Sequence, residues 1–113
     1  MASNMKLNNI FKHIPADLSD EAFEKIAGSE HVAIERIVSK GHRSPETGWY
    51  DQVRDEWVIL LQGNAEITFA TGEILKLAAG DHVNIPAHAK HKVSWTDPDT
   101  ESIWLAVHYS TST

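Results

Sequence analysis

The chain carries seven histidines and no cysteine, so its reactive groups are nitrogen and oxygen donors, with no thiolate among them. Without cysteine there can be no disulfide framework, thiolate nucleophile, iron–sulfur cluster or cysteine zinc site. Any metal ion bound by this chain is therefore expected to use nitrogen and oxygen ligands.

Two of the histidines, His88 and His91, are three residues apart in a segment rich in turn residues. A tight loop there would bring both imidazoles to one rim of a site. His42 lies on a loop that can reach the same rim. His108 ends an apolar run and either points inward with Trp104 or caps the run. Histidines 13, 31 and 82 are most simply surface or structural residues.

An acidic cluster surrounds Arg54 and consists of Asp51, Asp55 and Glu56. Carboxylates close together can have separated pKa values and so serve as acid and base. The alternative is a solvated loop face. Four aromatic residues have a similar ambiguity, because they can line a cavity or fill a core: Trp49, Tyr50, Trp95 and Trp104.

The elements that must position these groups are mainly strands. After Gly28 the sequence shows short runs rich in Val, Ile, Trp and Thr, separated by turn residues about every ten residues, which is typical of an all-β barrel or sandwich. The predicted strands are His31–Ser39, Glu56–Gln62, Ala65–Ala70, Glu73–Leu77, His82–Ile85, His91–Trp95 and Glu101–Tyr109.

A short helix from Asp20 to Ala27 is predicted before the strands, because capping residues and acids precede it and Gly28 follows it. We therefore divide the chain into an N-terminal segment, residues 1–30, whose helix packs on the barrel, and a barrel domain, residues 31–113.

The run from Trp57 to Leu61 is apolar on both faces, which predicts a strand covered on both sides. Without a cover on the outer face, the outward residues Trp57, Ile59 and Leu61 would be exposed to solvent. The N-terminal segment can cover part of them, and a partner subunit the rest, so a homodimer is expected over a cover made by the chain alone.

Composition limits the partners. The formal net charge is −6, and the scattered basic residues give no patch that attracts a phosphate backbone or anionic lipid, so neither nucleic acid nor a membrane is expected as a partner. No apolar run approaches the roughly 20 residues of a membrane span. Residues 1–10 lack the apolar stretch of a signal peptide, so the expected location is the cytoplasm.

Two stretches resemble the signature motifs of the cupin superfamily. Residues 80–91 (GDHVNIPAHAKH) are similar to the second motif, with His88 where a glycine is usual. Residues 44–57 (SPETGWYDQVRDEW) resemble the first motif of a small single-domain cupin subfamily with a Trp-Tyr-Asp-Gln run. The resemblance implies a double-stranded β-helix, also called a jelly-roll barrel, with Glu56 and His91 as site residues.

The first motif departs from that of a typical metal cupin, because Tyr50 and Gln52 stand where two histidines are usual. The resemblance therefore implies a metal set of Gln52, Glu56 and His91, with His88 as a further ligand. Such donors suit Zn, Fe, Ni or Mn, and the sequence does not select among them. Tyr50 shares a strand parity with Gln52 and would act beside the metal as a hydrogen-bond donor or proton relay.

Three hypotheses about function follow. The first is a metal-binding cupin of undetermined reaction, such as a metal-dependent oxygenase or isomerase acting on a small organic molecule. The second is a module that binds a small ligand without turnover. The third is a dimeric barrel with a residual site. A cupin fold alone does not decide among them.

Overall fold

The computed structural model describes residues 5–45 and 47–110, and every regular element in that part of the chain is a β-strand. The strands form a five-stranded antiparallel sheet in the order β1-β2-β8-β3-β6 and a three-stranded sheet in the order β5-β4-β7. Their bounds are β1 (Ala22–Gly28), β2 (Val32–Ser39), β3 (Asp55–Gln62), β4 (Asn64–Phe69), β5 (Ile74–Ala78), β6 (His82–Ile85), β7 (His91–Thr96) and β8 (Ser102–Tyr109).

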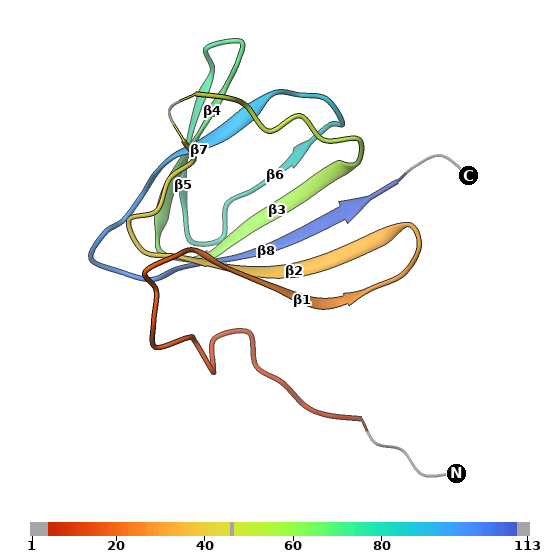
Figure 1. The fold of residues 1–113 in the computed structure, drawn as a ribbon, viewed down its shortest axis with the longest axis vertical. Helices are drawn as coiled ribbons and strands as arrows, with labels where there is room; N and C mark the ends of the chain where they lie inside the picture. The colour runs from red at the N-terminus through yellow and green to blue at the C-terminus, as the bar shows by residue number, and fades with distance from the viewer. Residues whose placement is uncertain (1–4, 46, 111–113) are drawn as a thin grey trace.

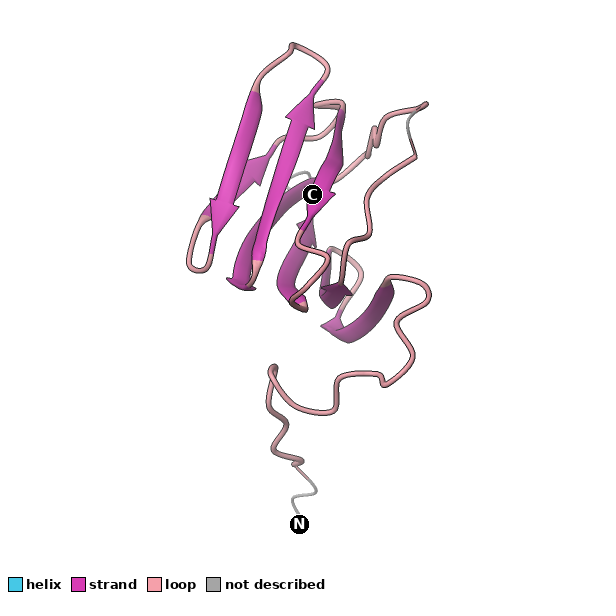
Figure 2. Ribbon diagram, turned by 90° about the vertical axis from the view of Figure 1, so that its left-hand side faces the viewer, coloured by secondary structure: helices cyan, strands magenta, loops and turns pink. Residues whose placement is uncertain are grey.

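The seven strands predicted from His31 onward are confirmed, and each observed end lies within one residue of the predicted one. Figure 1 shows the smaller sheet lying over the larger one, and Figure 2 shows the same two layers from the side. The core lies between the layers and includes Leu60 and Trp104, which are almost fully buried. In these same described ranges, no helix has the length and apolar character needed to cross a membrane.

The predicted helix from Asp20 to Ala27 is wrong, because residues 22–28 form β1, which pairs with β2. In this pairing Phe23 lies opposite Ile37, and Lys25 lies opposite Glu35. The capping residues and the apolar spacing suited a helix locally, but pairing with β2 offers backbone hydrogen bonds along one side of the strand and a side-chain match. Tertiary pairing of this kind overrides a weak local propensity.

Arg36 provides that match. Its guanidinium lies 2.6 Å from the Glu24 carboxylate of β1 and donates hydrogen bonds to the carbonyl oxygens of Ile10, Lys12 and His13. The Arg36 side chain is buried, so these contacts fix part of the segment before β1 against the sheet. The remainder of that segment extends away from the two layers (Figures 1 and 2).

Alternation along β3 separates its two faces. Glu56, Val58 and Leu60 point inward and are buried, whereas the outward residues between and after them, at positions 57, 59 and 61, are half-buried. After β3 the chain crosses to the smaller sheet at Gly63, whose φ is +95°. A Cβ at Gly63 would lie 2.3 Å from the Ser102 Oγ, so only glycine fits this crossing.

Candidate functional site

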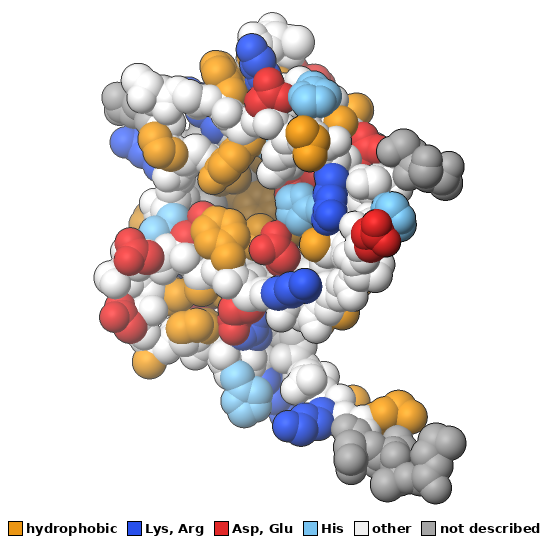
Figure 3. All heavy atoms as spheres, turned by 45° about the vertical axis from the view of Figure 1, so that its right-hand side comes forward, with side chains coloured by type: hydrophobic (Ala, Val, Ile, Leu, Met, Phe, Trp, Pro, Cys, Tyr) orange, Lys and Arg blue, Asp and Glu red, His pale blue; other side chains and the backbone are white. Residues whose placement is uncertain are grey.

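A cavity of about 160 Å³ opens between the two sheets. That volume is enough for several water molecules or one small organic molecule. Figure 3 shows its mouth as a hollow surrounded by hydrophobic, acidic and histidine side chains. The lining residues are Glu21, Phe23, Glu35, Ile37, Tyr50, Gln52, Glu56, Val58, Ile67, Ile85, His91, Val93, Trp104 and His108.

Backbone hydrogen bonds join the two motif segments on one side of the cavity. Tyr50 and His91 form an isolated bridge with N···O distances of 2.8 and 3.2 Å. The His88 amide donates to the Gln52 carbonyl oxygen at 2.8 Å. The loop before β3 is thus fixed to the loop before β7, which brings Tyr50, Gln52 and His91 to the same cavity as predicted.

His91 and Glu56 form a buried pair inside the cavity. The distance from His91 Nε2 to Glu56 Oε1 is 3.6 Å, and only 6% and 11% of their side chains are exposed. On the other side of the ring, His91 Nδ1 lies 2.8 Å from the Ala89 carbonyl oxygen. A carbonyl can only accept, so Nδ1 carries a hydrogen and Nε2 is the atom that gains or loses a proton.

Opposing effects act on the pKa of His91. Burial lowers the pKa, because it disfavours the charged imidazolium, but the contact with the Glu56 carboxylate and its charge, together with the Ala89 carbonyl, outweigh burial and raise the pKa above its ordinary value. His91 therefore holds its proton at a higher pH than a solvated histidine does. This suits an acid–base group that works near neutral pH.

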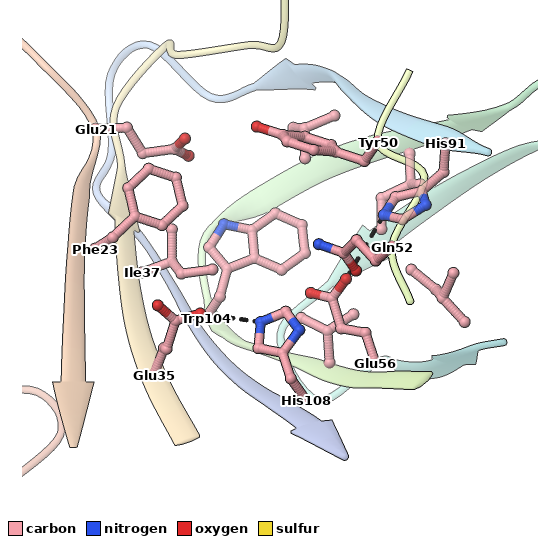
Figure 4. Close-up of a pocket in the computed structure, with 14 residues that line it drawn as sticks. Glu21, Phe23, Glu35, Ile37, Tyr50, Gln52, Glu56, His91, Trp104 and His108 are labelled. Atoms are coloured by element: carbon pink, nitrogen blue, oxygen red, sulfur yellow. Dashed lines mark hydrogen bonds and ion pairs between the residues drawn. The ribbon is translucent and has the colours of Figure 1, made fainter. Parts of the chain in front are cut away.

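A second histidine–carboxylate pair lines the same cavity. His108 Nε2 lies 2.9 Å from the Oε1 of Glu35, which belongs to β2. Across the sheet, His108 is the direct register partner of Glu56. The cavity wall therefore carries a row of alternating carboxylate and imidazole groups, from Glu35 through His108 and Glu56 to His91 (Figure 4).

Two glutamates and a phenylalanine are among the lining residues that were not predicted from the sequence. Glu35 reaches the cavity through the β2–β8 register, and Glu21 and Phe23 reach it because residues 22–28 are a strand. Side chains alternate between the two faces of a strand, so the predicted strand at residues 31–39 was the sequence signal that could have placed Glu35 on the inner face. Of the two orientations considered for His108, the inward one is correct.

His88 does not line this cavity. Its side chain is 65% exposed, its φ is +64°, and its Nδ1 lies 2.7 Å from Asp51 Oδ1. His42 is also absent from the lining, and its Nδ1 accepts a hydrogen bond from the Lys40 amide.

The acidic cluster around Arg54 is dispersed in the structure. Asp51 pairs with His88, Asp55 accepts from the Ala87 amide, and Glu56 enters the cavity. Arg54 itself donates to the Glu30 carbonyl oxygen. Of the four aromatic residues, Trp104 belongs to both the core and the cavity floor, and Tyr50 lines the cavity, whereas Trp49 and Trp95 are each 40% exposed and do not line it.

The donor set fits a divalent ion only in part. The 3.6 Å between His91 Nε2 and Glu56 Oε1 lets both atoms reach one ion at about 2.0–2.2 Å. A third ligand would have to be the neutral amide of Gln52. Within residues 5–45 and 47–110, no three histidine, aspartate or glutamate side chains come close enough to hold a metal ion together. With one imidazole, one carboxylate and one neutral amide as ligands, we expect a divalent metal ion to bind weakly.

Comparison with known proteins gives structural matches. No protein-family model and no curated protein matched the chain. A crystal structure from Ralstonia eutropha JMP134, of a protein provisionally named a mannose-6-phosphate isomerase, is 37% identical, covers 95% of this chain and 100% of its own, and superposes with a TM-score of 0.90.

Two solved structures with lower sequence identity are described as cupins. A cupin superfamily protein from Desulfitobacterium hafniense DCB-2 is 21% identical, with 96% of this chain and 94% of the other covered and a TM-score of 0.74. A cupin family protein with a double-stranded β-helix fold from Methanocaldococcus jannaschii is 20% identical, with 96% and 93% covered and a TM-score of 0.69. The two facing sheets, the paired motif segments and these matches agree: the chain is related to the Ralstonia protein and has the cupin fold, a double-stranded β-helix.

Proposed function

We propose that this cupin binds a small organic molecule in its cavity and transfers a proton on it, as an isomerase does. The observation that carries the proposal is the orientation of His91, whose Nδ1 is held by the Ala89 carbonyl while Nε2 faces Glu56 and the cavity. His91 acts as the general acid and base. Glu56 sets its orientation and favours its protonated form.

Tyr50 and Gln52 complete the proposed site. The Tyr50 ring lies 5.8 Å from the His91 ring, centroid to centroid, and both residues line the cavity. The Tyr50 hydroxyl is suited to donate a hydrogen bond to a ligand oxygen or to relay a proton. Gln52 offers an amide that can both donate and accept, so it is suited to orient the ligand.

The name of the Ralstonia protein suggests a sugar phosphate, but the cavity does not support that substrate class. Phosphate groups are usually held by Arg, Lys or helix N-termini. Of the described residues that line this cavity, three are glutamates and none is lysine or arginine. The basic side chains visible near the mouth in Figure 3 lie outside the lining. We therefore propose an isomerase-like reaction on a molecule without a phosphate.

Solvent exchange offers a test that needs no identified product. Small carbonyl compounds with a hydrogen on the adjacent carbon are incubated with the protein in D₂O, and deuterium incorporation is followed by NMR. We expect the wild-type protein to catalyse exchange in a subset of these compounds. His91→Gln should slow this exchange by about 100-fold, the usual contribution of a general base.

The matched control is His31→Gln, which changes an exposed histidine outside the cavity and should leave exchange unchanged. Equal exchange rates in wild-type and His91→Gln protein, for every compound that exchanges, would show that His91 does not transfer the proton. Ligand binding without any exchange would instead favour the alternative, a module that binds a small molecule without turnover.

A second candidate function is favoured by the spacing of Glu56 and His91, which can hold one divalent ion together with the Gln52 amide. Bound there, the ion would polarise a substrate carbonyl as a Lewis acid. The protein is dialysed against Zn, Fe(II), Ni or Mn and its metal content is measured. We expect partial occupancy that His91→Ala abolishes. Only traces of each ion in the wild-type protein would overturn this candidate.

We also propose that the chain forms a homodimer through the outward face of β3. The support is that Trp57, Ile59 and Leu61 are large apolar residues left half-buried in a single chain. Light scattering at micromolar concentration should give the mass of two chains, and Ile59→Lys should shift the protein to monomer. A wild-type monomer would overturn the proposal.

A further inference from the structure

The cavity lining has an uneven charge. Its ionisable lining residues, among those described, include three carboxylates, Glu21, Glu35 and Glu56, and no lysine or arginine. Two of the carboxylates face an imidazole, because Glu56 pairs with His91 and Glu35 with His108. Glu21 has a different partner.

Glu21 accepts a hydrogen bond from the hydroxyl of Ser39, which is fully buried. A hydroxyl fixes the carboxylate in place but brings no positive charge to it. Figure 4 shows the Glu21 carboxylate directed across the cavity toward the Tyr50 hydroxyl. The mouth of the cavity thus holds a positioned negative charge that the two histidines deeper in the cavity do not neutralise.

Aromatic rings line the same cavity. Phe23 and Tyr50 line the cavity although 56% and 43% of their surface is exposed, which places them at its mouth. Trp104 also lines the cavity, and because only 3% of its surface is exposed, it forms the floor. A positive charge is attracted to the face of an aromatic ring, and the attraction increases when water is excluded.

We propose that the cavity selects small organic cations, with the ligand's ammonium group held between Glu21 and the rings of Phe23 and Tyr50. The inference concerns the same cavity as the proposed function and names its substrate class. An ammonium group gains a charge-assisted hydrogen bond to Glu21 and ring contacts that a neutral ligand does not gain. An anion of the same size is repelled by the Glu21 carboxylate.

Three small molecules that share a phenyl ring and differ in charge test this inference by calorimetry at pH 7: benzylamine, benzyl alcohol and benzoate. We expect benzylamine to bind about tenfold more tightly than benzyl alcohol, which is the effect of one charge-assisted hydrogen bond. Benzoate should bind most weakly. If benzyl alcohol or benzoate binds as tightly as benzylamine, or if none of the three binds, the inference is overturned.

Variants of the chain locate the effect. Glu21→Gln keeps the shape of the side chain and should remove most of the preference for benzylamine while leaving benzyl alcohol binding unchanged. Phe23→Leu keeps an apolar side chain without the ring and should weaken benzylamine more than benzyl alcohol. Glu73→Gln removes an exposed carboxylate outside the cavity and is the matched control. Unchanged selectivity in both cavity variants contradicts the inference.

The result separates this inference from the proposed function. Selective binding of benzylamine together with failed solvent exchange in every compound would support the cation site and refute proton transfer. Exchange that depends on His91 but occurs only in neutral compounds, with no preference for benzylamine, would support proton transfer and refute the cation site.

Discussion

Two histidine–carboxylate pairs, whose histidines are three residues apart in the chain, differ in both distance and burial. His88 and Asp51 are 2.7 Å apart, with 65% and 42% of their side chains exposed. His91 and Glu56 are 3.6 Å apart, with 6% and 11% exposed. The shorter distance belongs to the pair on the surface, and the longer distance to the pair in the cavity.

Burial, more than distance, decides which pair can do chemistry. Water and salt screen an exposed ion pair, so its contribution to stability is usually about 0–1 kcal/mol. A buried pair is screened much less, and each partner strongly affects the protonation of the other. The pKa of His91 is raised in this way, because the attraction of Glu56 and the Ala89 carbonyl exceeds the opposing effect of burial.

The largest expected effect comes from breaking the buried pair. Glu56→Gln keeps the side-chain shape but removes the negative charge, so burial should dominate and the pKa of His91 should fall below the ordinary value of 6.5. NMR titration of the imidazole ring measures this pKa. A pKa still above 6.5 in the variant would mean that Glu56 does not control the protonation of His91.

The pH dependence of stability should distinguish the wild-type protein from Glu56→Gln. In the wild-type protein the pKa of His91 is higher in the folded than in the unfolded state, so its stabilisation is complete below about pH 6.5 and is lost as the pH rises through the folded value. In Glu56→Gln the folded pKa lies below the unfolded one, so stability should instead rise with pH.

The two slopes should differ in sign, so the difference between the two free energies of unfolding should change between mildly acidic and mildly alkaline pH. Urea unfolding at a series of pH values measures both proteins. Parallel curves would show that His91 has the same pKa in both proteins.

How much of this could be predicted from the sequence depended on whether a feature was local. The strands from residue 31 onward were predictable, because apolar alternation and turn residues such as Gly63 and Gly80 mark them within short windows. Glu56 and His91 were found through the spacing of the two cupin-like motifs. Gln52 and Tyr50 followed from the same frame and do line the cavity.

The parts that were missed depend on pairing between distant strands. Residues 20–28 carry good helix signals, and only the edge of β2, with Arg36 opposite Glu24, makes a strand the better solution. Glu35 meets His108 because β2 and β8 pair across 73 residues of sequence, a register that no local window contains. His88 was predicted as a ligand from its closeness to His91, but its positive φ turns it outward to Asp51.

The smallest expected effect comes from breaking the exposed pair. Asp51→Asn removes the charge next to His88 but leaves both side chains in solvent, so the free energy of unfolding should change by less than about 0.5 kcal/mol at any pH between 5 and 8. Urea unfolding measures it alongside Glu56→Gln. A loss comparable to that of Glu56→Gln would mean that the exposed pair is coupled to the cavity, through the hydrogen bond from the His88 amide to the Gln52 carbonyl. In that case exposure alone would no longer separate the two pairs.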